Sequence, residues 1–548
     1  IQLRVAIQTA LTDGLPEVVE SPWILQVYVE DEPSLQGFQK EVAKYAQPGA
    51  RDTAYTRHFQ QTLSAHLAQI TRPGGLFEDT AVTGTHWRGQ IRRVRATLYR
   101  RLKPNGRTPS AVEVEEALND VATKWVASLA SAGIRARRGN GQDLYEWLLK
   151  WFNPKPEIAN GNPDKLLEIA PYPGDENLPF GHDLAERLTL TLPRSENATA
   201  TWWFDDLPHT LVTIQGLRRA PEVGHMTAER QAGDHVFSLF DRFPEHTVMV
   251  LTLTARPQDF TRNHIAQVKR AAVGDSAEAD LTREDAEAVE REMARGNKLY
   301  PLGMAFYVRG DDVKTLRANV NQLNALLLPN GLQPILHESD LLALDSYLRN
   351  LPMAYDASLD KASRRSRLVF SSHTANLLPL YGRSKGTGHP GLVFFNRGAE
   401  PLVFDPLHRA DRKKNAHMLI LGPTGAGKSA LLVYLLQQMA AVYRPRIFII
   451  EAGGSFSLLG QQFQAYGLAV NQVTLNPNTD VSLPPFADAL RVLQKERQHH
   501  LRMDPEALAE DDEELDEEGG GRDVLGEMEI AARIMITGGD EREDARLT

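Results

Sequence analysis

Residues 422–429 of this chain read Gly-Pro-Thr-Gly-Ala-Gly-Lys-Ser and match the pattern G-x-x-x-x-G-K-[ST] at every position. The apolar run His417–Gly422 comes directly before this motif, and a long apolar run extends from Ser429 to about Tyr443. A buried strand, a glycine-rich loop and a helix, in this order, form the context in which the motif folds. With Arg446–Glu451 as the next strand, the pattern predicts a parallel β-sheet covered by helices.

The same loop is suited to binding the phosphates of ATP. Gly425 and Gly427 have no side chain, so the backbone can adopt positive φ and direct its N–H groups at the β-phosphate. The first turn of the following helix adds unpaired N–H donors and the positive end of the helix dipole. We expect Lys428 to reach the β- and γ-phosphates and the Ser429 hydroxyl to coordinate Mg²⁺. The predicted residues that bind the cofactors ATP and Mg²⁺ are Gly422, Pro423, Thr424, Gly425, Ala426, Gly427, Lys428, Ser429 and Ala430.

ATP hydrolysis requires a carboxylate as well, usually at the end of a further strand, to hold Mg²⁺ and orient the attacking water. No apolar run ending in Asp or Asp-Glu follows the loop. Glu451 ends the run Arg446–Glu451 and is the candidate catalytic acid beside Lys428, with a role as a mere cap of the strand end as the alternative. The sequence therefore supports ATP binding better than ATP turnover.

The chain has 548 residues, enough for roughly two to four domains. Strand-like runs such as Trp23–Glu30 and helical runs such as Ala111–Leu129 indicate mixed α and β structure in the first part. The boundaries predicted from composition are an amino-terminal α/β region at 1–153, a linker at 154–198, an α+β domain at 199–363, a β segment and the P-loop domain at 364–484, and a helical insertion at 485–548 with an acidic, disordered loop at 505–522.

Several segments of the second region have a clear periodicity. Thr201–Ile214 and Thr247–Thr254 are rich in branched and aromatic residues and are predicted to be β-rich. Thr282–Gly296 and Asp312–Leu328 are predicted to be helices, with a strand at Pro301–Arg309 between them.

Two aromatic or basic segments are interpreted as structural. Trp87–Lys103 is basic and is predicted to be an amphipathic helix, with Ile91, Val94, Leu98 and Leu102 on one face. Its arginines could contact phosphates, but a core-facing helix with a solvated arginine face is the favoured interpretation. Trp147 and Trp151 recur at helical spacing and are expected to anchor a core or a domain interface.

Charge and composition exclude several classes of protein. The formal net charge is −10, so any contact with DNA must be local. The absence of cysteine excludes disulfides and thiolate metal sites. No apolar run reaches the ~18 residues of a transmembrane helix, so membrane attachment is expected to come through partners. The chain starts at Ile1 without an initiator methionine, and we expect residues to be missing upstream.

Several stretches together resemble the type IV secretion and conjugative-transfer ATPases, the TraC and VirB class. Upstream of about Leu351, only the general layout is similar to that family. The stretches that carry the resemblance are Asn415–Ser429, Glu451–Phe456, Leu475–Pro477, Gly386–Pro390 followed by Phe394–Arg397, and Ile536–Gly539.

This resemblance implies an ATP-binding RecA-like motor that assembles as a homo-hexamer in the cytoplasm, at the cytoplasmic face of the inner membrane. It further implies a function in pilus assembly or the transfer of DNA or protein, with inner-membrane secretion components and a coupling protein as partners. In the family, the acid at the position of Glu451 is usually Asp. The family's Walker B strand and arginine finger should lie beyond a helical insertion, so we expect this chain to be truncated at both ends and ATPase activity to belong to the full-length protein.

Two other functions remain open from the sequence. One is a DNA translocase of the FtsK or coupling-protein kind, which shares the P-loop but usually has transmembrane helices near its start. The other is a non-catalytic, nucleotide-gated assembly scaffold, which the missing acidic strand would favour.

Overall fold

The computed structural model describes residues 2–102, 110–177, 183–274, 276–474, 486–487, 489–491, 493–494, 524–540 and 542. The chain divides into two compact units, Ile1–Gly453 and Gly454–Thr548. In the second unit, α16 (Ser457–Ala465) and α18 (Val524–Thr537) are helices. The acidic loop expected at 505–522 and the Leu475–Pro477 motif lie outside the described residues, as does most of the expected helical insertion.

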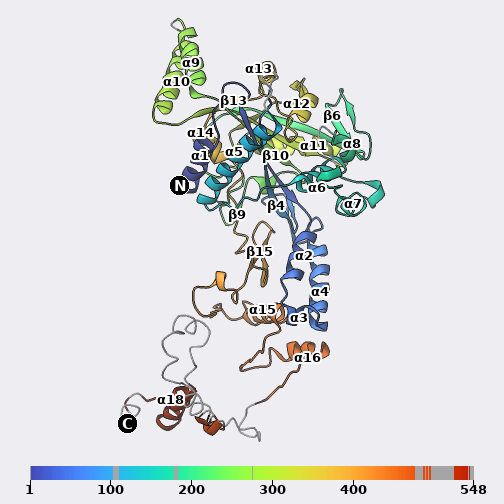
Figure 1. Cartoon of the computed structure of the whole chain (residues 1–548), viewed down its shortest axis with the longest axis vertical. Helices are drawn as coiled ribbons and strands as arrows, with labels where there is room; N and C mark the ends of the chain where they lie inside the picture. The colour runs from blue at the N-terminus through green and yellow to red at the C-terminus, as the bar shows by residue number, and fades with distance from the viewer. Residues whose placement is uncertain are drawn as a thin grey trace. The chain divides into compact units, whose positions relative to one another are not determined.

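A large antiparallel sheet organises the first unit (Figure 1). In the described part of the chain it has nine strands, and its main path runs β4-β1-β10-β11-β7-β6-β5, with β12 beside β7 and β13 beside β11. The strands are β1 (Trp23–Glu32), β4 (Ile91–Tyr99), β5 (Arg194–Glu196), β6 (Thr201–Phe204), β7 (Leu207–Leu217), β10 (Val248–Ala255), β11 (Leu299–Arg309), β12 (Leu332–Pro334) and β13 (Arg367–Phe370). Regions 1–153 and 199–363 thus contribute strands to one sheet and share its core.

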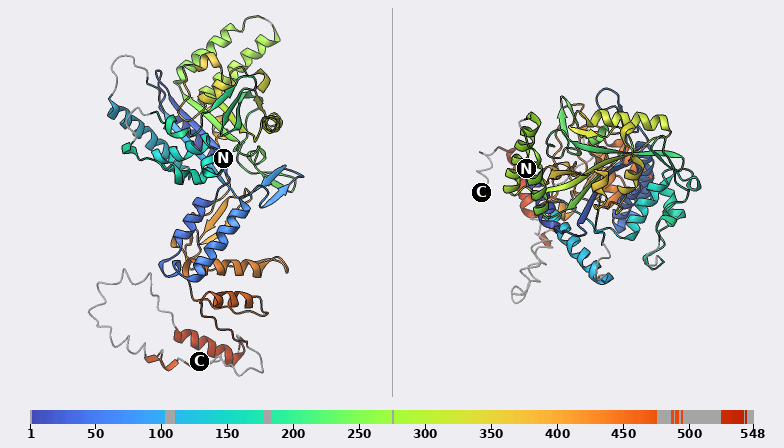
Figure 2. Two further views of the ribbon diagram at one scale, coloured as in Figure 1. Left: turned by 90° about the vertical axis from the view of Figure 1, so that its right-hand side faces the viewer. Right: turned by 90° about the horizontal axis from the view of Figure 1, so that it is seen from above.

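Helices cover both faces of this sheet (Figure 2). Because side chains alternate along each strand, the sheet has an apolar core on each face, and each core needs helices to cover it. In β1, Val27 and Val29 point into one core, while Tyr28 points into the other. The first core is covered by α1 (Gln2–Gly14), α5 (Ala111–Ser131), α11 (Val313–Leu327) and α14 (Ser371–Leu377), and the second by α6 (Gly141–Phe152), α7 (Pro163–Ile169), α8 (Ala185–Leu188) and α12 (Ala343–Arg349). Strands buried on both sides have apolar residues almost throughout, as β10 does.

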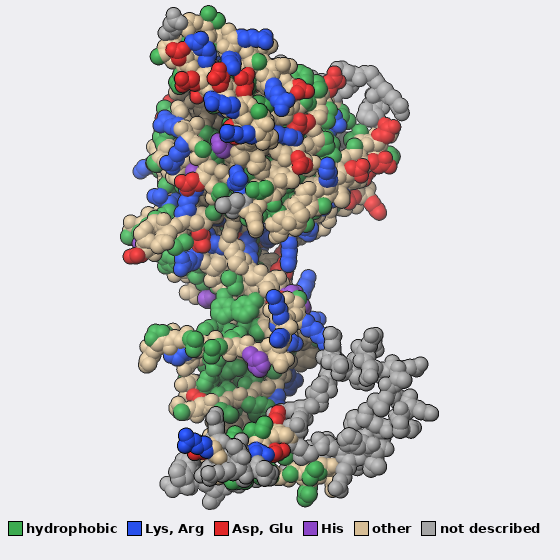
Figure 3. Space-filling view, turned by 90° about the vertical axis from the view of Figure 1, so that its left-hand side faces the viewer, with side chains coloured by type: hydrophobic (Ala, Val, Ile, Leu, Met, Phe, Trp, Pro, Cys, Tyr) green, Lys and Arg blue, Asp and Glu red, His purple; other side chains and the backbone are tan. Residues whose placement is uncertain are grey.

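Smaller elements surround the sheet. They include the helices α2 (Gln36–Tyr45), α3 (Pro48–Arg51), α4 (Ala54–Ile70), α9 (Gln258–Ala271), α10 (Ala277–Ala294), α13 (Asp360–Ser363) and α15 (Lys428–Tyr443), and the hairpins β2 (Phe77–Asp79)–β3 (Thr85–Trp87), β8 (Arg230–Ala232)–β9 (His235–Phe237) and β14 (Leu392–Phe395)–β15 (Pro401–Phe404). The surface in Figure 3 carries charged side chains of both signs at its upper end, over α9 and α10, and apolar side chains at the height of α15.

Most of the expected elements are confirmed. The helices predicted from Ala111, from Thr282 and from Asp312 correspond to α5, α10 and α11. Helix α5 begins with a capping box in which Ser110 and Glu113 each accept a bond from the other's backbone N–H. Trp147 and Trp151 lie on α6 in or against the second core, as expected for anchoring residues.

The prediction of a basic helix at Trp87–Lys103 was wrong. Residues 91–99 form strand β4, which pairs with β1 in an unbroken antiparallel register. Ile91, Val94 and Leu98 have the spacing of one helical face. In a strand, however, successive side chains point to opposite faces of the sheet, and the arginines of this segment follow that pattern. Arg92 lies buried on one face, whereas Arg95 reaches Glu30 on the other.

The described residues of the linker predicted at 154–198 are folded onto the sheet. They contain α7 and α8, and the side chains of Leu166 and Leu188 are buried in the second core. Asn160 and Gly161 lie in the turn before α7 with positive φ, and Pro163 is the first residue of that helix, so these residues mark the start of a short helix.

The parallel sheet expected around the P-loop is not shown. Residues 417–422 and 446–451 belong to no helix or strand, and the strand ladders of the described residues are antiparallel. Leu419 is 81% exposed and Ile450 is fully exposed. A run of apolar residues becomes a strand only when a neighbour satisfies its backbone groups, and none does so among the described residues. The fold shown is mixed α/β with a large antiparallel sheet.

A buried ionic network joins the sheet to the segment that leads to the hairpin β14–β15. Arg92 donates to Asp31 Oδ2 at 2.7 Å and to Asp241 Oδ1 at 2.9 Å. Arg383 donates to Asp241 Oδ2 at 2.6 Å, and the Glu400 carboxylate accepts from the Arg92 backbone N–H at 2.9 Å. The network connects residues more than 300 positions apart in the sequence.

Acid is expected to destabilise the first unit through Asp241. Burial alone would raise the pKa of this carboxyl, but the charges and hydrogen bonds of Arg92 and Arg383 outweigh burial and hold the pKa at about 2. An ordinary Asp has a pKa of about 3.9, so the stabilisation is present above about pH 4 and is lost as the pH falls toward 2. Urea unfolding would measure how far the free energy of unfolding falls between pH 5 and pH 2.5. This fall should be smaller in Asp241→Asn than in the wild type by about 2 kcal/mol. Equal losses in both proteins would contradict this assignment.

Candidate phosphate-binding site

Helix α15 carries the P-loop at its amino-terminal end and is anchored on two sides. On one side, the Thr56 hydroxyl of α4 donates to Ala441 O at 2.9 Å, and the Gln47 N–H donates to Val442 O at 2.8 Å. Along the same side, the Tyr55 hydroxyl donates to Gln437 O at 3.2 Å. Residues from the beginning of the chain therefore hold the carboxyl-terminal half of the helix.

The hairpin β14–β15 holds α15 from the other side. The Val393 N–H donates to Gln438 Oε1 at 2.7 Å, and the Tyr434 hydroxyl donates to Val393 O at 2.6 Å. Tyr45 and Tyr443 both donate to the carboxylate of Asp405, which follows β15. These contacts involve residues that sequence reasoning did not include in the site.

The loop itself has the backbone conformation that the motif predicts. Gly425 and Gly427 have φ of 81° and 86°, in the left-handed region that side chains disfavour. Gly427 is the N-cap of α15, and no side chain caps this end of the helix. The N–H groups of the first turn therefore lack intrahelical acceptors and are available to an anion.

Lys428 folds back over the loop. Its Nζ donates to Gly422 O and to Pro423 O, each at 2.8 Å. The ammonium group therefore lies beside the first residues of the motif and is solvent-exposed, as are all of residues 421–430. A phosphate could replace the two carbonyls as acceptor, because a charged acceptor makes the stronger hydrogen bond.

The predicted cofactor-binding residues lie together because they are contiguous. Thr424, Ala426, Ser429 and Ala430 are exposed around the loop and the first turn of α15. Glu451 is exposed at the end of the apolar run 446–451. Its catalytic role and the Mg²⁺-binding role of Ser429 remain predictions.

The motif Gly386–Pro390 forms a polar cluster near α15. His389 Nδ1 lies 2.6 Å from Asp411 Oδ1, the Thr387 hydroxyl donates to Asp411 Oδ2, and the rings of His389 and His408 stack at 3.7 Å. Among the described residues, His389, His408 and Asp411 are the group whose ligand atoms could hold a metal ion, since they lie within 4.8 Å of one another. In the structure, Asp411 is already satisfied by Thr387, His389 and the Asp405 N–H.

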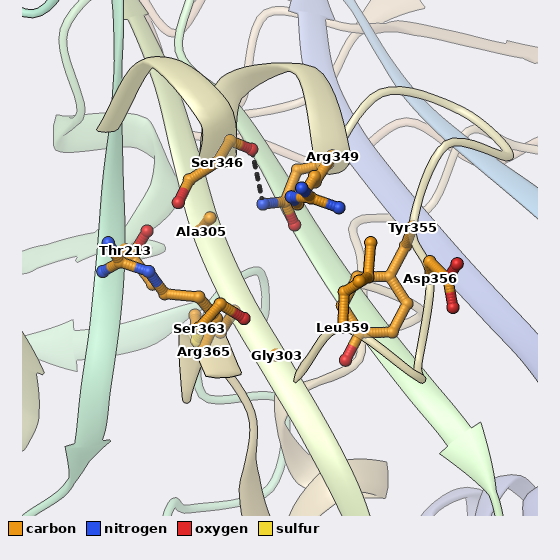
Figure 4. A pocket seen from close by; sticks show the side chains of 12 residues that line it. Thr213, Gly303, Ala305, Ser346, Arg349, Tyr355, Asp356, Leu359, Ser363 and Arg365 are labelled. Atoms are coloured by element: carbon orange, nitrogen blue, oxygen red, sulfur yellow. Dashed lines mark hydrogen bonds between the residues drawn. The ribbon is translucent and has the colours of Figure 1, made fainter. Parts of the chain in front are cut away.

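A small cavity beside β7 and β11 is separate from the P-loop (Figure 4). Thr213, Arg349, Tyr355 and Arg365 are among the residues that line its volume of about 20 Å³. That volume suits about one water molecule, and the Thr213 hydroxyl and Arg365 Nε have no partner in the described part of the protein. We interpret the cavity as a structural water site and not as a nucleotide pocket.

Comparison with known proteins identifies the family. Residues 2–355 match the family described as TraC protein, a range that spans the large sheet and its covering helices except strand β13 and helix α14. This chain belongs to the TraC family. The family recognised in the sequence is thereby confirmed, and it is a family of conjugative transfer. The match ends before the P-loop, whereas the motifs that carried the resemblance lie after residue 385.

A curated relative of this TraC-family chain is the conjugal transfer protein TrbE of Rhizobium radiobacter. The two are 30% identical over 154 residues, which is 27% of this chain and 18% of the relative. The similarity thus spans less than a fifth of the relative's length. Of the helices in the described residues, none is both long and apolar enough to cross a membrane.

Proposed function

We propose that this TraC-family chain is the ATP-binding motor component of a conjugative type IV secretion system. The observation that carries the proposal is the loop 422–429, with two glycines at positive φ, a helix N-terminus without a side-chain cap, and a lysine ammonium beside the loop. This combination binds the phosphates of nucleoside triphosphates in P-loop proteins.

The surroundings of the loop support a RecA-like domain as part of the proposal. The exposed side chains of Leu419, Leu421, Phe448 and Ile450 belong to the two runs expected to be parallel strands. Apolar surface of this kind is normally covered, and a parallel sheet would cover it. By the family resemblance, the protein assembles as a hexamer at the cytoplasmic face of the inner membrane and contacts secretion components there.

Thermal unfolding with nucleotides tests the ATP-binding function. Mg²⁺-ATP at about 100 times its Kd should stabilise the first unit by about 2.7 kcal/mol and raise its Tm by a few degrees. AMP, which lacks the β- and γ-phosphates, should give no shift. Equal shifts with ATP and AMP, or no shift with ATP at millimolar concentration, would refute the proposal.

Turnover assays separate the motor from its alternatives. Hydrolysis that requires oligomerisation but not DNA is expected of a secretion motor with Glu451 or another acid in the catalytic role. Hydrolysis stimulated by DNA would favour a DNA translocase, and binding without hydrolysis would favour a nucleotide-gated scaffold.

A further inference from the structure

Strand β4 is the edge of the large sheet, and the outward backbone groups of Val94, Ala96 and Leu98 have no partner in the described part of the chain. It pairs with β1 on one side only. On the other side, the Arg92 N–H donates to Glu400 Oε1 and the Arg92 carbonyl accepts from Lys385 Nζ, both at 2.9 Å. Backbone groups alternate in direction along an antiparallel strand, so those of Val94, Ala96 and Leu98 point the same way as those of Arg92. They form an open ladder.

Helices α5 and α6 and the open edge of β4 line one groove, which also extends along α2 and α4. The volume of the groove, about 1970 Å³, exceeds the 300–1,000 Å³ of a typical small-molecule site and is large enough for a peptide segment. Its floor includes residues 93–98 of β4. Its walls include Leu118, Ala122, Trp125 and Val126 of α5, and Leu144, Trp147 and Trp151 of α6.

Only part of the edge carries the features that usually prevent strand addition: Arg92, Arg93 and Arg95 place charges in its first half, whereas residues 96–99 are uncharged. Residues 91–99 contain no Pro, Gly or Lys, and their register with β1 has no bulge. Val94 is 39% exposed, although it lies on the same face of the sheet as the apolar side of α5. A strand placed beside β4 would complete the hydrogen-bond ladder and bury Val94 together with the α5 side chains.

The charges in the groove indicate what kind of strand fits. The carboxylates of Glu30, Glu32, Asp143 and Asp164 in its walls are each already paired with an arginine or a lysine. Arg135 and Arg138, in the segment between α5 and α6, are exposed and have no ion-pair partner among the described residues. Asp31 is paired with Arg92, Glu146 and Glu168 are the remaining acids of the groove, and Lys40 is a further cation that lines it. Acidic side chains on an added strand would meet these free cations.

We propose that the β4 edge is a docking site for an extended segment of a partner protein, added as a further antiparallel or parallel strand. The segment combines apolar side chains, which contact the apolar walls of α5 and α6, with acidic side chains, which meet Arg135 and Arg138. Main-chain bonds to Val94, Ala96 and Leu98 supply affinity, and the two walls supply specificity. This site is independent of the P-loop and of nucleotide binding.

Fluorescence anisotropy with labelled ten-residue peptides tests the proposal on the whole chain. The probe alternates Val with Glu, and the comparison peptides replace Glu by Lys or carry N-methyl groups on alternate amides. Ala96→Pro removes one outward N–H without removing a bond to β1, and Ala96→Val is its matched control. We expect the Val-Glu probe to bind, and N-methylation or Ala96→Pro to weaken it by about 10-fold or more, while Ala96→Val has little effect.

Replacing Arg135 and Arg138 provides a second test of the proposal. Arg135→Ala combined with Arg138→Ala should weaken the Val-Glu probe and reduce the salt dependence of its binding, because both changes remove charge from the groove. No binding of the probe at millimolar chain concentration, or equal affinity for the N-methylated peptide, overturns the proposal. The N-methylated peptide decides the question even if Ala96→Pro fails to fold. Self-association of the chain that Ala96→Pro abolishes would assign the edge to a second copy and overturn the choice of a partner segment.

Discussion

Replacing Lys428 with alanine is expected to weaken the binding of Mg²⁺-ATP by about 100-fold. In the structure, Lys428 Nζ donates to Gly422 O and to Pro423 O, so the ammonium group lies beside the first residues of the loop. With nucleotide bound, the ammonium would form charge-assisted bonds to the β- and γ-phosphates, and losing such bonds costs about 3 kcal/mol. Isothermal titration calorimetry of the two proteins would measure the difference directly.

Lys413→Ala is the matched control for this change, since Lys413 is an exposed lysine close to the motif but outside it. Its removal should change the affinity for ATP by less than about 3-fold, as expected for an exposed surface charge outside the binding loop. Lys428→Ala should unfold at the same temperature as the wild type in the absence of nucleotide, because the side chain is exposed. Equal affinities of the Lys428→Ala and wild-type proteins would show that the loop does not bind phosphate.

Replacing Arg92 with alanine is expected to lower the free energy of unfolding of the first unit by about 3–5 kcal/mol. Arg92 is buried, and its guanidinium bonds both Asp31 and Asp241. Without Arg92, the negative charges of these two carboxylates would be less well neutralised in the buried network. Removing one partner of a buried ion pair is strongly destabilising because it leaves the other charge uncompensated. Urea unfolding followed by circular dichroism would measure the loss.

The neighbouring Arg93→Ala provides the comparison. The Arg93 side chain is 50% exposed and pairs with Glu32 at 3.2 Å, so its removal should cost less than about 1 kcal/mol. A similar small loss for both variants would mean that Arg383 alone neutralises Asp241 and that the network does not depend on Arg92.

The elements that the sequence predicted well are those whose local pattern and tertiary environment agree. Helix α5 has a capping box at Ser110 and a helical apolar period, and strand β10 is a short branched run that both cores bury. Residues 91–99 show the opposite case. Their spacing satisfied a helical period, but pairing with β1 and the burial of Arg92 against Asp31 made the strand the stable form.

The family was recognised from the sequence through motifs that lie outside the region of the family match. The match covers residues 2–355, where the sequence showed only a general layout, because sheet strands tolerate many apolar residues and leave few short motifs. The P-loop motif is readable because each of its positions has a distinct chemical requirement. The residues that hold the helix after the loop could not be predicted from the sequence. Thr56 and Gln438 are ordinary polar residues, and their role in holding α15 comes only from the hydrogen bonds that the fold lets them form.

The sequence by itself determined the loop at 422–429, because glycines, a lysine and a following helix specify local backbone geometry without help from distant residues. It also determined most of the helices and buried strands, whose periodicity is local. Only the tertiary structure decided which strands share one sheet, that the α3–α4 region and β14–β15 hold α15, and that β4 is an open edge. These features depend on contacts between residues hundreds of positions apart, and no local pattern encodes which distant groups satisfy a strand's hydrogen bonds or a buried charge.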